Sequence, residues 1–450
     1  MEKEQRSFRW GHEALHLEFV LGDDGDARLT HLGLPDEAAN GPRGSLPLVE
    51  VTATGHGRDW SGSRLVQTAI GGRLRHRANR AAGDGDWHTL TVQLHDPDTG
   101  LVAEVTYRSP DGISVLRSEV TLRNEGPDTL HLESVSSFAM GCLTTPDPAG
   151  LDAADLLWAE NDWLAECRWQ RRPLRLTTPD HRGRVSHANG RSGFALTGQG
   201  TWSSCGRLPM GGLTDRRTGR SWVWQIEHNG GGWRWECAER DKTVCLALFG
   251  PTDTHHGRRQ PLEPGAVFRT VPVALSFGAD GGPDAAFAAL TSRHRCPQPE
   301  DSLDEVAFTM ASGLLGRIHL SGLLPELGPE ARALVHEAVA VYKAVRAGLP
   351  GAVPSWPLGL PGWDDPWIAL ALHTPDTTYL TVWRRPGGAA TIPLRLPERS
   401  GGAACAEVLY PVARQAVAAW NPDTADLTVT LPTTPSAALL RITRTAPDAP

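Results

Sequence analysis

Three carboxylates lie close together in one segment of the sequence: Glu160, Asp162 and Glu166. Glycosidases use two carboxyl groups roughly 5 to 9.5 Å apart across an open cleft, one as general acid and one as nucleophile or base. The same segment also carries three arginines: Arg168, Arg171 and Arg172. Because interleaved opposite charges are satisfied most simply by pairing with each other, we interpret these acids as ion-pair partners and assign no catalytic residue here.

The tryptophan content indicates a second kind of chemistry. The 16 Trp outnumber the 9 Phe and 4 Tyr together, and the face of an indole ring packs well on the C–H face of a sugar. Trp60 lies in a polar loop with Arg64, whose guanidinium could donate paired hydrogen bonds to sugar hydroxyls. Trp163, in the acidic segment, is a further candidate for sugar binding. The alternative is a surface turn with Trp60 partly buried, since filling a core is the commoner role of a single Trp.

No metal or cofactor is predicted. His228, His255 and His256 have no third ligand at a useful spacing. The glycines at 230–232 are not followed by Lys and Ser or Thr, which a phosphate-binding loop would require. The seven cysteines are scattered, without a Cys-x-x-Cys pair, which predicts reduced thiols rather than disulfides or a zinc site.

Charge and hydropathy limit the partners and the location. A net charge of −8 argues against nucleic acid and anionic membrane surfaces as partners. The sequence has no apolar run of 18 residues, so no transmembrane helix is expected. Residues Met1 to Arg6 lack the apolar stretch of a signal peptide. Together with the reduced cysteines, this predicts a cytoplasmic protein.

The elements that position these residues are mostly strands. Leu15, Leu17, Phe19 and Leu21 fall on one face, and the glycines at 22 and 25 predict a turn after them. Similar alternation recurs through residues 8–140 and again through 192–276. Short alternating runs separated by turn residues predict a large antiparallel β-sandwich. A short helix is expected over residues 284–290.

Residues 302–347 carry the convincing helical pattern. Ser302 followed by Glu305 predicts a capping box, and Pro329 predicts the first turn of a second helix. The apolar face of that second helix is Leu334, Val335, Ala338, Val341, Tyr342 and Val345. A short strand is expected between the helices, over residues 316–320. Six strands are then expected at 367–372, 379–383, 391–396, 407–410, 427–431 and 439–442.

Four runs in this part of the chain resemble the C-terminal end of glycoside hydrolase family 36, the bacterial α-galactosidases. They are Gly316-Arg-Ile-His-Leu-Ser-Gly322, Val341-Tyr-Lys343, Trp356-Pro-Leu-Gly-Leu-Pro361 and Tyr379-Leu-Thr-Val-Trp-Arg-Arg385. The N-terminal region resembles the family too. The resemblance implies a β-supersandwich, a (β/α)8 barrel and a C-terminal β-sandwich, with a retaining activity on α-galactosides that needs no metal or redox cofactor. It also implies galactosides as partners, and a homo-oligomer in which the loop at residues 55–64 reaches a neighbouring subunit.

The barrel that the resemblance implies does not fit into this sequence. Such a barrel takes about 250 residues and rarely fewer than 200, whereas 55 residues, from Cys296 to Pro350, lie between the β-rich regions. They contain Asp301 and Asp304, neither in a motif like those of the family's catalytic aspartates. We therefore predict a mainly β chain with a β-supersandwich over 1–290, a barrel remnant of two helices and one strand over 291–350, and a β-sandwich over 351–450.

Two functions follow from this reading. The first is an α-galactosidase-like protein that lacks the catalytic aspartates and is inactive alone. The alternative is a non-catalytic carbohydrate-binding or interaction protein, or the product of an internal deletion. In either case the helix from Pro329 to Ala347 loses the barrel strands that would cover its apolar face. Because exposed apolar surface is unfavourable, we expect this helix to dock on one of the β-domains.

Overall fold

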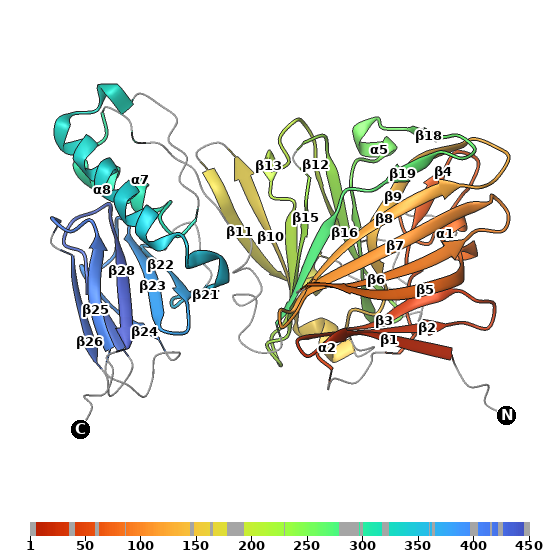
Figure 1. The fold of residues 1–450 in the computed structure, drawn as a ribbon, viewed down its shortest axis with the longest axis horizontal. Coiled ribbons are helices and arrows are strands. Elements are labelled where there is room, and N and C mark those ends of the chain that lie inside the picture. The colour runs from red at the N-terminus through yellow and green to blue at the C-terminus, as the bar shows by residue number, and fades with distance from the viewer. Residues whose placement is uncertain are drawn as a thin grey trace. The chain divides into compact units, whose positions relative to one another are not determined.

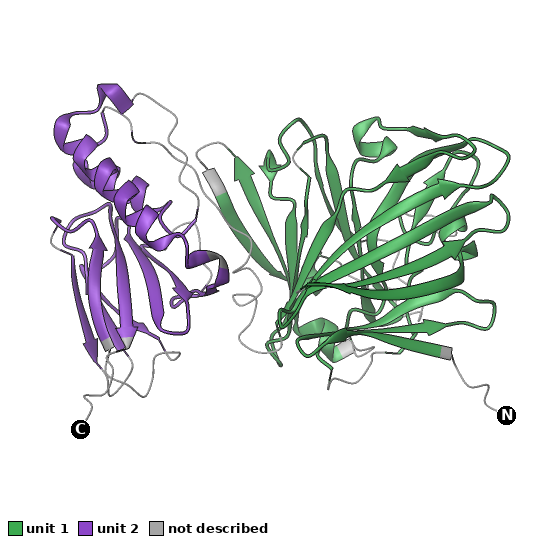
Figure 2. Ribbon diagram, in the orientation of Figure 1, with its two compact units in different colours: residues 1–286 green, residues 287–450 purple. Residues whose placement is uncertain are grey.

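The computed structural model describes residues 6–35, 41–58, 63–85, 87–144, 148–162, 165–177, 193–228, 230–278, 297, 300–316, 324–359, 361, 365–396, 404–414, 416–421 and 426–444. The chain divides into two compact units, Met1–Ala286 and Phe287–Pro450 (Figure 2). The described residues are predominantly in strands, which confirms the predicted mainly β fold (Figure 1).

The first unit is built from antiparallel sheets, the largest of which has eleven described strands. Its main path runs β11 (Ala165–Pro173), β10 (Ala154–Asp162), β14 (Met210–Asp215), β15 (Ser221–Ile226), β20 (Val273–Gly278), β8 (Val115–Asn124), β7 (Leu101–Pro110), β6 (Trp87–His95) and β5 (Arg75–Asp84). Two short strands pair alongside it: β13 (Gly206–Arg207) on β10 and β19 (Val267–Arg269) on β8.

Two smaller sheets complete the strands of this unit. One follows the order β12 (Phe194–Gly198), β16 (Trp233–Arg240), β17 (Thr243–Phe249), β9 (Leu130–Met140) and β18 (Gln260–Leu262), with β4 (Val51–Ala53) on β9. The other is β1 (Arg6–His12), β2 (Leu15–Leu21) and β3 (Ala27–Gly33). Short helices lie in the connections: α1 (Ala69–Arg73), α2 (Pro148–Ala153), α3 (Leu174–Thr177) and α5 (Asp253–His256).

One apolar core joins these sheets. Trp224 of β15 and Trp235 of β16 meet edge to face across it, with ring centroids 5.2 Å apart. Leu17 and Phe19 of β2 belong to the same core, and the N–H of Gly25 closes the predicted turn by donating to the carbonyl of Gly22 at 3.0 Å. The alternation in the sequence therefore identifies the buried face of β2 correctly.

The second unit combines two sheets and two helices. A five-stranded sheet follows the order β21 (Val353–Ser355), β22 (Trp367–His373), β23 (Thr377–Arg384), β28 (Ser436–Arg444) and β25 (Ala404–Tyr410). A three-stranded sheet follows β24 (Thr391–Arg395), β27 (Asp426–Thr430) and β26 (Val417–Asn421). The helices are α7 (Leu303–Ala311) and α8 (Pro329–Val345), with 3-10 turns η1 (Leu324–Glu326) and η2 (Leu349–Gly351).

Local sequence explains where both helices begin. At α7 the Ser302 hydroxyl accepts the N–H of Glu305, and the Glu305 carboxylate accepts the N–H of Ser302, which is the predicted capping box. Pro329 opens α8, because its fixed φ suits the first turn and its missing N–H would have no partner there. Both predicted helices are confirmed.

The apolar face of α8 is covered by the C-terminal sheet of its own unit. Leu334 and Ala338 share a core with Met310 of α7 and with Tyr410 and Leu439 of the sheet. A second link joins Trp383 of β23 to the end of α7, where its Nε1 donates to the Ser312 hydroxyl at 2.9 Å. The predicted docking of this helix on a β-domain is confirmed. Each large apolar side chain buried in this way contributes roughly 1.5–3 kcal/mol relative to exposure in water.

The six strands predicted after residue 366 are all present, whereas β21 and β26 were not predicted. Pro354 makes β21 difficult to predict from sequence, because proline disfavours strands except at the edge of a sheet. In the structure β21 lies at such an edge. In β26 the half-buried positions alternate with exposed ones, and small Ala residues supply little apolar contrast. The expected helix at 284–290 and residues 317–320 of the expected strand lie outside the described residues. The three-part division at 290 and 350 remains a prediction.

Two further predictions, on membrane-spanning helices and on disulfides, can be compared with the described residues. Across them, no helix combines the length and apolar character needed to cross a membrane. Six described cysteines take part in no disulfide: Cys142, Cys167, Cys205, Cys237, Cys245 and Cys405.

Candidate functional site

The polar loop that carries Trp60 and Arg64 connects β4 to α1. Residues 59–62 lie outside the described part of the chain, so a role for Trp60 in sugar binding stays a prediction. The described residues on either side of them meet at the base of the loop. Arg58 donates from Nη1 to the backbone carbonyl of Arg64 and forms a β-bridge with Thr68. The base of the loop is therefore closed by the chain itself.

Arg64 lies inside the first unit, with only 3 % of its surface exposed. It lies near Glu236 of β16, whose carboxyl is also buried. Burial raises the pKa of Glu236, against the opposing attraction of Arg234 and Arg64. The guanidinium of Arg64 thus balances charge within the fold. Binding of sugar hydroxyls by Arg64 remains a prediction that would require the loop to open.

Glu236 connects this loop to the strand beneath it. One oxygen, Oε1, accepts the backbone N–H of Leu65 at 2.8 Å. The other, Oε2, accepts Nε and Nη2 of Arg234 at 3.1 and 2.9 Å. Arg234 is 6 % exposed and Glu236 is 3 % exposed, so the pair is shielded from solvent. Removal of one charge would leave the other buried without its partner, which is costly.

The same hydrogen-bonded network continues to α5. Arg234 Nη1 donates to Nε2 of His255 at 3.3 Å, which makes that nitrogen an acceptor. His255 therefore carries its proton on Nδ1, which lies 3.1 Å from the Thr252 hydroxyl. Burial, with the nearby positive charge of Arg234, lowers the pKa of His255 to about 4. The ring is neutral near pH 7 and serves as a hydrogen-bonding link.

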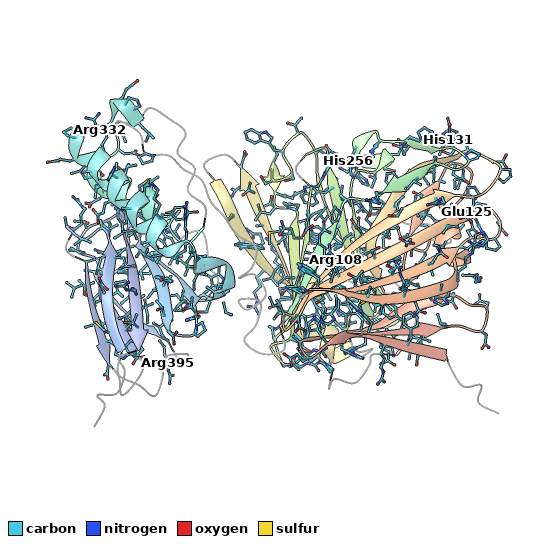
Figure 3. All side chains as sticks on the ribbon, viewed as in Figure 1. Arg108, Glu125, His131, His256, Arg332 and Arg395 are labelled. Carbon is cyan, nitrogen blue, oxygen red and sulfur yellow. The ribbon has the colours of Figure 1, made fainter. Side chains whose placement is uncertain are left out.

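His256 is neutral as well, with the opposite tautomer. Figure 3 labels this residue. Its Nδ1 accepts the N–H of Thr252 at 2.9 Å, and its Nε2 donates to the carbonyl of Gly198 at 2.9 Å. Because these bonds use both ring nitrogens, the histidine is held by the protein itself. Among the described residues, no group of three or more His, Cys, Asp or Glu side chains has an arrangement suited to a metal ion.

A second buried carboxylate, that of Glu50, holds the end of the loop. It accepts the N–H of Gln67 at 2.9 Å, and both the N–H and the hydroxyl of Thr68, at 2.9 and 2.7 Å. Burial raises the pKa of Glu50 to about 7, although these donors favour the carboxylate. A pKa near 7 suits a general acid. However, Glu50 is fully buried and its oxygens bond to the loop, so its observed role is to hold that segment.

The backbone beside Glu50 is unusual. Gln67 has φ of 61°, in the left-handed region that favours glycine. A Cβ added to Gly71 would lie 2.8 Å from a carboxylate oxygen of Glu50 and 2.6 Å from the Thr68 hydroxyl. The close approach of α1 to Glu50 therefore requires glycine at position 71.

The acidic segment forms the hairpin of β10 and β11. Its turn residues 163–164 lie outside the described part, so Trp163 stays a prediction. Glu160 accepts a hydrogen bond from Trp158 Nε1 at 3.3 Å and pairs with Arg207 of β13 at 3.3 Å. Arg171 instead pairs with Asp155, at 2.8 Å. Ion pairing is thus confirmed for Glu160. One partner comes from β13, because pairing of β13 with β10 brings Arg207 opposite Glu160, while Arg168 of β11 lies opposite Glu160 in the β10–β11 pairing.

The sequence reasoning did not identify Glu50, Arg234 or Glu236. A usable pattern was present for two of them, because Arg234 and Glu236 are opposite charges two residues apart in an apolar strand and so share one face. Glu50 is a single acid in the apolar run from Leu46 to Val51. A charge at such a position requires a buried partner, which identifies the residue but leaves the partner unknown.

Residues 50–208 match the family model of the glycosyl hydrolase family 36 N-terminal domain. The matched region begins at Glu50 and includes the loop, α1, the β10–β11 hairpin and β13. The chain carries a family 36 N-terminal domain. No curated protein matches the sequence.

Several solved structures with a similar fold are α-galactosidases. The enzyme of Lactobacillus brevis is 10 % identical, with a TM-score of 0.68, and the match covers 99 % of this chain and 99 % of that chain. AgaA of Geobacillus stearothermophilus, a family 36 enzyme, is 9 % identical, with a TM-score of 0.66 and coverage of 98 % and 100 %. A variant of AgaA solved with raffinose is 9 % identical, with a TM-score of 0.67, and the match covers 98 % of this chain and 100 % of that chain. At this identity the likeness shows a shared fold.

Proposed function

We propose that this protein recognises α-galactosides and does not hydrolyse them on its own. The observation that carries the proposal is the family 36 N-terminal domain at residues 50–208, in a chain that has 55 residues from Cys296 to Pro350 for a barrel. A (β/α)8 barrel requires about 250 residues. The raffinose complex of AgaA indicates the class of ligand to test first.

The contacts of the segment from Cys296 to Pro350 support the proposed lack of glycosidase activity. Its described residues before Val353 form helices and turns, with no strand among them. Asp304 accepts two hydrogen bonds from Arg414, the one from Nε at 2.7 Å. This ion pair commits its carboxylate to linking α7 with the chain after β25. A glycosidase instead needs two carboxyl groups facing a substrate across an open cleft.

The packing of α8 favours a protein that is stably folded at its present length over the unselected product of an internal deletion. In a chain that had just lost its barrel, the apolar face of this helix would lack a partner. Here Leu334, Ala338 and Val345 are buried. Recognition without turnover therefore accounts for the observations better than a damaged enzyme does.

Incubation of the full chain with an aryl α-galactoside tests the catalytic part of the proposal. We expect no release of the aryl group above the buffer rate, and we expect raffinose binding by saturation-transfer NMR. Asp301→Asn and Asp304→Asn are the variants to compare, because these are the two aspartates of the intervening segment. Turnover by the wild-type chain that either substitution abolishes would overturn the proposal.

A further inference from the structure

The loop between β12 and β13 holds a tryptophan in solvent. Trp202 is 64 % exposed, although burial of an indole is among the largest stabilising contributions a side chain can make. Among the described residues from 193 to 232, it is the only large apolar side chain that is exposed. An indole with this much exposed surface offers part of its face to a ligand.

The loop around Trp202 is fixed by three hydrogen bonds from two other segments, the start of β16 and the end of β10. The N–H of Gly231, Nε1 of Trp233 and Nδ2 of Asn161 donate to the carbonyls of Gly200, Ser203 and Ser204, at 3.1, 2.5 and 2.6 Å. Asn161 is buried, and its side-chain oxygen also accepts the N–H of Cys167 at 3.0 Å. Backbone groups on both sides of Trp202 are therefore held by hydrogen bonds.

Charged groups lie beside this loop. Arg207 follows Trp202 by five residues and pairs with Glu160 at 3.3 Å, with 42 % and 35 % of their side chains exposed. Five residues span at most about 17 Å when extended, and the bond from the N–H of Cys205 to the carbonyl of Trp202 folds this span into a turn. The separation is within reach of an oligosaccharide. A half-exposed ion pair is weak, so its groups are available to hydroxyls.

The surroundings favour a sugar over a protein partner. Protein-binding patches are contiguous apolar areas of several hundred Å2. The exposed residues that flank Trp202 in the chain are instead polar or small: Gln199, Gly200, Thr201, Cys205 and Gly206. One rigid indole beside an acid and an arginine combines a stacking face with a hydrogen-bond acceptor and donor, which is what a pyranose requires.

We propose that Trp202, Glu160 and Arg207 form a carbohydrate-binding site in which a galactosyl ring stacks on the indole. Glu160 and Arg207 then form hydrogen bonds with hydroxyls of the same or the next sugar unit. This inference rests on the proposed recognition of galactosides and gives it a location. It is separate from the candidates Trp60, Arg64 and Trp163.

Binding of raffinose to the full chain, measured by saturation-transfer NMR and calorimetry, tests the site. We expect Trp202→Ala to weaken binding by at least about tenfold and Trp202→Phe to weaken it less, because a smaller aromatic face remains. Glu160→Gln and Arg207→Met should each weaken it severalfold. The matched control is Trp87→Ala, which removes another exposed indole, 38 % exposed and covered by Arg108 at 4.9 Å, and should leave the affinity unchanged. In the wild-type chain, bound raffinose should also shield Trp202 from quenching by acrylamide. A residue that served only folding would not give this result.

Three results would overturn the proposal. If the wild-type chain binds raffinose and Trp202→Ala binds it equally well, the site is wrong while galactoside recognition stands. If the wild-type chain binds no galactoside, both proposals fail. If Trp202→Ala instead abolishes self-association measured by sedimentation, with sugar binding unaffected, the indole is a contact between copies of the chain.

Discussion

Glu236 accepts the backbone N–H of Leu65 at 2.8 Å across 171 residues of sequence. This bond joins the base of the Trp60 loop to the strand that carries Arg234, and through Arg234 to α5. The loop is therefore anchored from below by a buried charge pair. If the loop binds a ligand, the rigidity of this anchor limits the conformational entropy lost on binding.

Removal of the anchor should destabilise the first unit strongly. Glu236→Ala leaves the Arg234 guanidinium buried without its partner, and we expect a loss of about 3–5 kcal/mol in the free energy of unfolding, measured by urea denaturation. Glu227→Ala is the matched control, since it breaks the half-exposed pair with Arg117, at 2.8 Å, and should cost no more than about 1 kcal/mol. Equal effects of the two substitutions would contradict the anchoring role.

Glu50 should make stability depend on pH. Its pKa in the fold is about 7, above the ordinary 4.5, so the folded state holds the proton more tightly between these values. The contribution is full below about pH 4.5, falls as pH rises, and is lost above about 7, a change on the order of 3 kcal/mol. Unfolding free energies of wild type and Glu50→Gln, measured across this range, should diverge with pH. The exposed Glu263→Gln should follow the wild type. A pH-independent difference for Glu50→Gln would refute the assignment.

Gln67 offers a test of backbone strain in the same loop. At φ of 61°, glycine is favoured over residues with a Cβ by about 1 kcal/mol. We expect Gln67→Gly to unfold at a higher denaturant concentration than Gln67→Ala, the control that removes the side chain but keeps the Cβ. At ordinary backbone angles the order would be reversed, so a more stable Ala variant would argue against the left-handed conformation.

The docking of α8 predicts a difference between two alanines on one helix. Ala338 is fully buried against the sheet, whereas Ala340 is exposed. Ala338→Asp places a charge in the apolar core and should destabilise the second unit by at least about 3 kcal/mol. Ala340→Asp changes helix propensity equally and should cost less than about 1 kcal/mol. Similar losses in thermal unfolding would mean that this face of α8 is not buried.

Local patterns in the sequence were sufficient for much of the fold. The alternation from Leu15 to Leu21 gave a strand and its buried face, because side chains in a strand alternate sides. Ser302 and Glu305 gave the start of α7, because capping depends on residues three apart. The prediction that a complete barrel does not fit also rests on counting residues. These features depend on neighbours in the chain, which the sequence shows directly.

Other features were decided only by tertiary structure, because they depend on which distant residues meet. Arg64 reads as a surface donor in sequence, yet the fold buries it near Glu236. Glu160 lies among arginines in sequence, and strand pairing adds Arg207 of β13, a partner that lies 47 residues away along the chain. Trp202 looks like any other tryptophan until the bonds from Asn161, Gly231 and Trp233 show that its loop is held in place. Local composition cannot specify such partners, since burial and pairing arise only when strands far apart in the chain come together.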